Sequence, residues 1–205
     1  DGTTEDGTRL LMKKSMSQLH SPQVTMWGEH ETMGLDWFIK DVGGVRQLSH
    51  GGGTNGQITV LLLVPQHDFA IAIFTNADRG MRVRQEVTRW ALKQYLGLEI
   101  PDPVPLEYSE EKLLPYVGRY VRPYSEIELA MLGGKLVAQV TPKGSFPSQH
   151  EPIPPAPPPM SLALCEKDRL LVLDGPMKDS LVDIIRKPDG TIGWLRSGRI
   201  HVRET

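Results

Sequence analysis

The sequence is poor in the features that would assign it at once to a special class of protein. It has one cysteine, Cys165, in 205 residues, which excludes an internal disulfide framework. Lysine and arginine total 23 against 25 acidic residues, so no charge excess points to nucleic acid or an anionic membrane surface as a partner. No apolar run approaches the roughly 20 residues that span a bilayer, so we expect no membrane span. The composition indicates an ordinary globular protein of one large or two small domains.

Glycine, by contrast, is concentrated in residues 48–57, LSHGGGTNGQ, where His50 precedes three glycines and the apolar run ITVLLLVP follows. A zinc site is disfavoured because the other histidines are scattered without metal-ligand spacing, and we expect no metal or cofactor. A phosphate-binding loop is disfavoured because the segment lacks the lysine and the following helix. A tight turn between strands is an alternative, but such a turn needs only one or two glycines.

The first half of the chain combines strands with helices. Apolar spacing predicts a helix within residues 8–20, and Gly43-Gly44 predicts a turn between two strands. Residues 57–65 and 69–76 predict a hairpin that is apolar almost throughout, so we expect both strands to be buried on both faces in the middle of a sheet. Residues 82–98 predict a helix that ends at a glycine. Its expected buried stripe is Val83, Val87, Trp90, Ala91 and Tyr95.

The second half changes character after a proline-rich stretch. We expect a domain over residues 1–100, a linker over 101–115 and a second domain over 116–205. Short alternating segments in the last part predict a small antiparallel barrel or sandwich, which makes the fold class α+β. Prolines exclude 151–159 from a strand ladder and predict an extended loop, and a proline-rich peptide ligand is the alternative.

The stretch HGGGTNGQITVLLLVPQHDFAIAIFTNAD, followed by a helix, resembles the end of the serine β-lactamase and penicillin-recognising fold. Esterases and D-amino-acid peptidases related to class C β-lactamases share this fold. His50-Gly51-Gly52 matches the histidine version of the Lys-Thr-Gly triplet on the strand that borders the active site. Residues 34–37, GLDW, resemble the GLGW that precedes the triplet in many members, with Asp36 in place of glycine.

The resemblance implies roles for residues on this strand. The amide of Gly53 would be an oxyanion donor. His50 would direct a hydrogen bond or a positive charge toward the nucleophile or a substrate carboxylate. Gly51 and Gly52 would let the backbone approach the substrate, and Asn55 would lie beside it.

The second half has a resemblance of its own, over roughly residues 116–203. YVGRY and the GGKL hairpin are similar to the lipocalin-like β-barrel appended to many class C-type peptidases and esterases. Such a barrel can hold a small apolar ligand. The alternative is a barrel filled by its own side chains.

The sequence departs from the family where the nucleophile belongs. It has no Tyr-x-Asn, and its one Ser-x-x-Lys, Ser109–Lys112, follows the triplet and lies in the expected linker, where adjacent glutamates suit a helix start. We therefore expect a C-terminal fragment of a longer serine hydrolase, inactive alone, whose nucleophile lies upstream of Asp1. Its substrate would be an ester, a β-lactam or a D-amino-acid peptide.

Two further expectations accompany this one. The partner would be the missing N-terminal catalytic part or a second copy of the chain, and the family resemblance implies a periplasmic or secreted protein. The alternative function is a non-catalytic module, derived from the same family, that binds a small molecule or peptide.

Overall fold

A computed structural model describes residues 2–27, 31–54, 56–77, 80–144 and 152–204. The chain divides into two compact units, Asp1–Pro101 and Asp102–Thr205. Antiparallel strands dominate both units, and the helices are few, so the fold class is α+β as the sequence predicts. Within the described residues, no helix has the length and apolar character needed to cross a bilayer.

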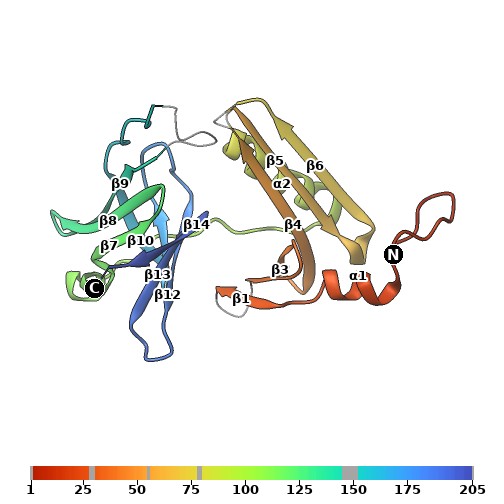
Figure 1. The fold of residues 1–205 in the computed structure, drawn as a ribbon, viewed down its shortest axis with the longest axis horizontal. Helices are drawn as coiled ribbons and strands as arrows, with labels where there is room; N and C mark the ends of the chain where they lie inside the picture. The colour runs from red at the N-terminus through yellow and green to blue at the C-terminus, as the bar shows by residue number, and fades with distance from the viewer. Residues whose placement is uncertain (1, 28–30, 55, 78–79, 145–151, 205) are drawn as a thin grey trace. The chain divides into compact units, whose positions relative to one another are not determined.

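The first unit is a six-stranded antiparallel sheet whose strands follow one another in chain order, with helix α2 packed against β5 and β6 (Figure 1). Its elements are α1 Lys13–Leu19, β1 Val24–Trp27, β2 Glu31–Met33, β3 Phe38–Val42, β4 Val45–Thr54, β5 Gln57–Val64, the 3-10 turn η1 Pro65–His67, β6 Phe69–Thr75 and α2 Gly80–Leu96. Gly43 and Gly44 have φ angles of 58° and 79° and form the predicted turn between β3 and β4. Strands β1 and β2 are absent from the sequence prediction.

Strands β5 and β6 correct one prediction, because they are not buried on both faces within this chain. Their inward residues, such as Leu62 and Val64, pack on Leu92 of α2. On the opposite face Leu61 is 41% exposed and Phe74 is 79% exposed. Moreover, β6 lies at the edge of the sheet rather than in its middle. The apolar runs therefore give this sheet a second apolar face that α2 does not cover.

Helix α2 corrects a second prediction. It occupies the expected segment and is followed by Gly97 with a φ of 66°, but its buried residues are Gly80, Ala91 and Leu92. Four members of the expected stripe are exposed by at least a third: Val83, Val87, Trp90 and Tyr95. Ala91, the fifth member, is buried as predicted. The helix has apolar residues on more than one side, so apolar spacing alone does not identify the side that packs on the sheet.

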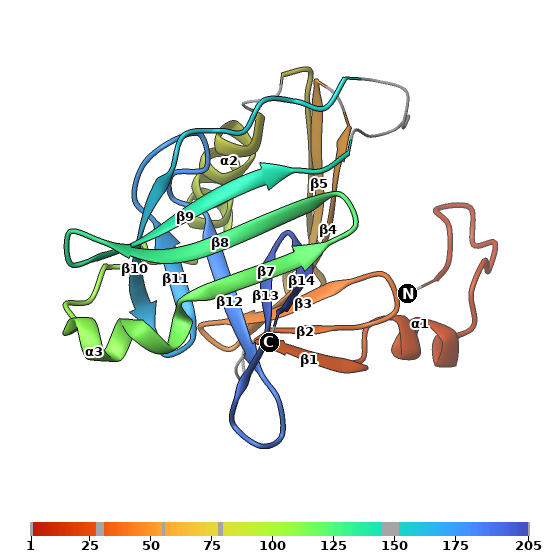
Figure 2. The ribbon, with the colours of Figure 1, turned by 60° about the vertical axis from the view of Figure 1, so that its left-hand side comes forward.

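The second unit is a closed eight-stranded antiparallel barrel, in the order β7 to β14 (Figure 2). Its strands are β7 Gly118–Arg122, β8 Ser125–Leu132, β9 Lys135–Pro142, β10 Met160–Glu166, β11 Arg169–Val172, β12 Leu181–Arg186, β13 Ile192–Ser197 and β14 Arg199–Arg203. Residues alternate between a buried inner set and an exposed outer set, as the sequence predicts. Two short helices precede it, α3 Glu110–Leu113 and η2 Leu114–Tyr116.

The proline-rich stretch before the barrel is partly packed on it. Leu106 donates a backbone hydrogen bond to the carbonyl of Leu164 at 2.7 Å, and Leu113 is buried in the barrel's hydrophobic core. Residues 152–159 form neither helix nor strand, and the side chain of Gln139 donates to the carbonyl of Pro157 at 3.0 Å. Residue 151 lies outside the described residues.

Candidate active-site strand

Strand β4 changes its surroundings at His50. Up to Ser49 it pairs with β3 on one edge and β5 on the other, because the β3 ladder ends at the pair Phe38–Ser49. From His50 to Thr54 the strand continues to pair with β5. Among the described residues, this last stretch has no strand on its second edge. The triplet therefore begins where a strand edge opens.

The backbone of β4 directs the Cβ of His50 away from α2. A Cβ on Gly51 would point to Arg84 of α2, and side chains alternate along a strand, so His50 points the other way. The residue is exposed, and its ring stacks on Phe38 with centroids 6.1 Å apart and an interplanar angle of 27°. The imidazole is thus held from one side and remains accessible.

Packing against Arg84 leaves no room for a side chain at Gly51. A Cβ there would lie 2.7 Å from the Arg84 Nη1 atom and 3.2 Å from the carbonyl oxygen of Thr59. The same Nη1 donates to that carbonyl at 3.4 Å, and burial lowers the pKa of the Arg84 guanidinium. Arg84 therefore fills the space behind the triplet and joins α2 to the strand beside it.

Of the remaining candidate residues, the structure describes Gly52 and Gly53. Gly52 and Gly53 are exposed, and a Cβ on them would meet Thr59 Oγ1 at 3.1 Å and Ile58 Cδ1 at 3.3 Å. Asn55, expected to lie beside the substrate, is outside the described residues. The strand thus brings His50, Gly51, Gly52 and Gly53 together in extended backbone at one open edge.

The Ser109–Lys112 motif belongs to a different environment. Ser109 precedes the four-residue helix α3, and its side chain makes no capping hydrogen bond, so the expected capping interaction is not formed. The Lys112 ammonium lies over the ring of Tyr108, 5.4 Å from its centroid. Ser109 also lies in the second unit, whereas the triplet lies in the first.

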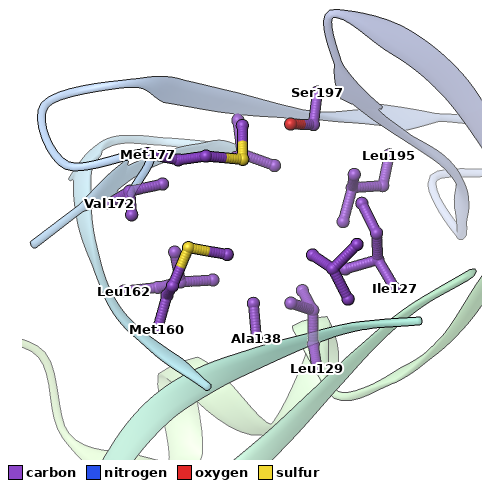
Figure 3. A pocket seen from close by; sticks show the side chains of 11 residues that line it. Ile127, Leu129, Ala138, Met160, Leu162, Val172, Met177, Leu195 and Ser197 are labelled. Carbon is purple, nitrogen blue, oxygen red and sulfur yellow. The ribbon is translucent and has the colours of Figure 1, made fainter. Parts of the chain in front are cut away.

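The barrel contains a partly open cavity of about 20 Å3, which is enough for about one water molecule (Figure 3). Apolar side chains dominate its lining, with Ile127, Leu195 and Met160 among them. The rest of the interior is filled by the barrel's own core. This packing favours the self-filled barrel over a ligand-holding one. Among the described residues, no group of three histidine, cysteine or acidic side chains could hold a metal ion.

Comparison with known proteins agrees with the sheet, the helix and the barrel. Residues 2–96 match the model of the Beta-lactamase family. The first unit is β-lactamase-like. Over 128 residues the chain is 29% identical to Penicillin-binding protein 4 of Amycolatopsis lactamdurans. The aligned region covers 60% of this chain and 34% of that protein.

The fold of both units recurs in solved structures. A crystal structure of SurE with D-Leu has a TM-score of 0.63 at 19% identity, over 95% of this chain and 44% of that one. A second SurE crystal structure has a TM-score of 0.57 at 19% identity, over 95% and 43%. The chain therefore spans less than half the length of these relatives. Both units thus have counterparts within the SurE chain.

Proposed function

We propose that this chain provides one wall of a serine-hydrolase acyl-transfer site, and that the nucleophilic serine belongs to polypeptide outside this chain. The observation that carries the proposal is the open β4 edge of a β-lactamase-like unit, where His50 begins a run of three glycines. An acyl substrate can lie along such an edge because the backbone has no side chains to hold it away.

Each residue has a distinct part in this proposal. The amide of Gly53 donates to the oxyanion of the tetrahedral intermediate. His50 donates a hydrogen bond toward the nucleophile or a substrate carboxylate, and its exposure at the open β4 edge supports this role. Gly51 and Gly52 keep the edge free of side chains. We also propose a substrate contact for Asn55, which is outside the described residues.

The proposed substrates are small esters, β-lactams and D-amino-acid peptides. The similarity to a penicillin-binding protein supports the β-lactam class. The presence of D-Leu in the SurE crystal structure supports D-amino-acid derivatives as probes. The partner that supplies the serine is the remaining catalytic part or a second copy of the chain.

A non-catalytic binding module is the second candidate. The absence of Tyr-x-Asn, and of Ser-x-x-Lys before the triplet, favours it. Its ligand would bind at the β4 edge or on residues 152–159, because a cavity of about 20 Å3 in the barrel is too small.

A fluorescent penicillin analogue tests the choice between them. The samples are this chain alone and a longer protein that includes the sequence encoded upstream of Asp1, and the labelled residue is identified by peptide mass spectrometry. We expect label only on the longer protein, at the serine of an upstream Ser-x-x-Lys, and loss of label when that serine becomes alanine. An unlabelled longer protein that lacks the upstream motif would contradict the proposal and leave the binding module.

A further inference from the structure

Three polar side chains meet at one end of the barrel, away from the triplet in sequence and in the other unit. Ser125 begins β8, His201 lies in β14, and Arg122 ends β7. The Ser125 Oγ lies 3.0 Å from His201 Nε2, and Arg122 Nε donates to the same oxygen at 2.7 Å. Closure of the barrel brings these residues together, since β14 pairs with β7 and β7 with β8.

The second ring nitrogen fixes which atom carries the proton. His201 Nδ1 lies 3.3 Å from the carbonyl oxygen of Arg199, which can only accept a hydrogen bond. In the tautomer that satisfies this carbonyl, Nδ1 carries the hydrogen, Nε2 is the acceptor, and the Ser125 hydroxyl donates to it. His201 is only 3% exposed, and burial lowers its pKa, so the ring is neutral near pH 7.

These contacts are the parts of an activated nucleophile: a hydroxyl, a base that accepts its proton, and a group that orients the base. A guanidinium on the hydroxyl oxygen adds a positive charge where negative charge develops on deprotonation. We propose that Ser125 is a nucleophile within this chain, separate from the serine proposed to lie outside it. Small activated carboxylic esters would acylate Ser125, with His201 as the base.

The step balances without a further reactant. Ser125 Oγ forms a bond to the carbonyl carbon, and its proton passes to His201 Nε2. The tetrahedral intermediate then breaks its bond to the leaving oxygen, which departs as an alkoxide or phenolate and takes the proton from His201. The products are an acyl-serine and an alcohol. A fluorophosphonate reacts in the same way at phosphorus, with fluoride as the leaving group.

The surroundings limit the size of the acyl group. Ser125 is half-buried and follows the exposed Tyr124 in the β7–β8 turn, so a reagent approaches from this end of the barrel. The next inward residue on the same face of β8, Ile127, is buried, and so is Leu195, which pairs with His201. The cavity behind them has a volume of about 20 Å3. Short acyl groups such as acetyl are therefore the expected substrates.

The test uses this chain with p-nitrophenyl acetate and a small fluorophosphonate, neither of which probes the proposal for the triplet. Release of p-nitrophenolate gives the rate, and mass spectrometry of peptides locates the label. We expect label on Ser125 in the unchanged chain and none there in Ser125→Ala. Ser197→Ala, another barrel serine, and Ser109→Ala, from the Ser-x-x-Lys motif, are matched controls that should keep it.

His201→Gln tests the base, and we expect labelling at least about a hundredfold slower, the usual contribution of a general base. Circular dichroism shows whether this variant folds, and if it does not, the comparison of Ser125→Ala with its controls decides. Absence of label on the folded, unchanged chain would overturn the proposal. So would label that persists in Ser125→Ala, or an unchanged rate in folded His201→Gln.

Discussion

At the scale of single residues, the clearest constraint is the contact between Gly51 and Arg84. The space that a side chain at position 51 would fill is already taken by the Nη1 atom of a partly buried guanidinium. A glycine in the triplet is thus required by packing on the helix side of the strand, as well as by any need for access on its edge.

Gly51→Ala should lower the free energy of unfolding of the first unit by about 1–2 kcal/mol, because Arg84 must leave its place and the Thr59 carbonyl is also close. Chemical denaturation measures the change. Gly53→Ala is the control with a smaller cost, since its Cβ would meet only the Ile58 methyl at 3.3 Å. In the background Arg84→Ala the cost of Gly51→Ala should shrink, and equal costs in both backgrounds would show that Arg84 is not the obstacle.

Asp183 is a buried carboxylate of the barrel that pairs with two arginines. It is 3% exposed, accepts from Arg169 Nε at 2.8 Å, and also pairs with Arg196. Asp183→Asn should destabilise the barrel by about 3 kcal/mol, because two largely buried guanidinium groups each lose an ion-pair partner. Glu204→Gln, which removes an exposed partner of Arg119, should cost under about 0.5 kcal/mol. Thermal unfolding of both variants checks this, and equal losses would contradict it.

At the scale of elements, the sequence predicts most of the strands and helices in which apolar residues recur at regular spacing. The β5–β6 hairpin is marked by two apolar runs around a turn, and the barrel strands by alternation, so both were found. Strand β1 has only four residues, and β2 has three that include Glu31 and Thr32, so neither gives an apolar pattern long enough to detect. The predicted buried stripe of α2 holds at Ala91 but is wrong at Val83 and Val87, because apolar residues lie on more than one side of the helix.

The polar contacts of the candidate sites could not be predicted for a related reason. Arg84 looks like an ordinary surface arginine in a helix, and only packing against β4 gives it a role. Ser125 and His201 lie 76 residues apart, and their contact depends on barrel closure, which alternation does not specify. Local pattern fixes the type of element, whereas pairing between distant elements decides which side chains meet.

Two groups should make the barrel sensitive to acid. Burial lowers the pKa of His201 below 6.5, so the unfolded chain binds a proton that the folded barrel does not, and stability falls as pH drops below about 6.5. Hydrogen bonds from Arg119 and Lys143 hold the pKa of Glu126 at about 2 against an ordinary 4.5. Its contribution is full above 4.5 and is lost as pH falls toward 2.

Hydrogen exchange of peptides from residues 118–203 across this pH range measures the effect on the barrel itself. His201→Gln should remove the decline that begins near pH 6.5 and leave the one that begins near 4.5. A barrel whose protection is unchanged between pH 7 and pH 5 would contradict the assignment of the first decline to His201.

At the scale of the whole molecule, the sheet of the first unit has an apolar face that α2 does not cover. Leu61 and Phe74 are exposed there, and β6 has an open edge. Exposed apolar surface of this kind is typical of a face that another polypeptide covers. This exposed face is consistent with the comparison, in which the chain spans less than half the length of its structural relatives.

The chain alone should therefore associate with itself or bind a dye that reports apolar surface, and Phe74→Ser should reduce both effects. Leu132→Ser is the matched control, because Leu132 is similarly exposed but lies at a barrel hairpin. Light scattering and dye fluorescence make the measurement. Monodisperse monomers without dye binding would argue against a missing partner.

The central claim is that the triplet strand works in acyl transfer together with a serine outside this chain. The most direct measurement is the rate at which the longer protein is acylated by a penicillin analogue, compared between His50→Ala and His67→Ala, an exposed histidine of the same unit. We predict a rate at least tenfold lower for His50→Ala and an unchanged rate for His67→Ala, since loss of one hydrogen-bond donor or charge at the reacting groups costs about this much or more. Equal rates for His50→Ala and the unchanged protein would contradict the account.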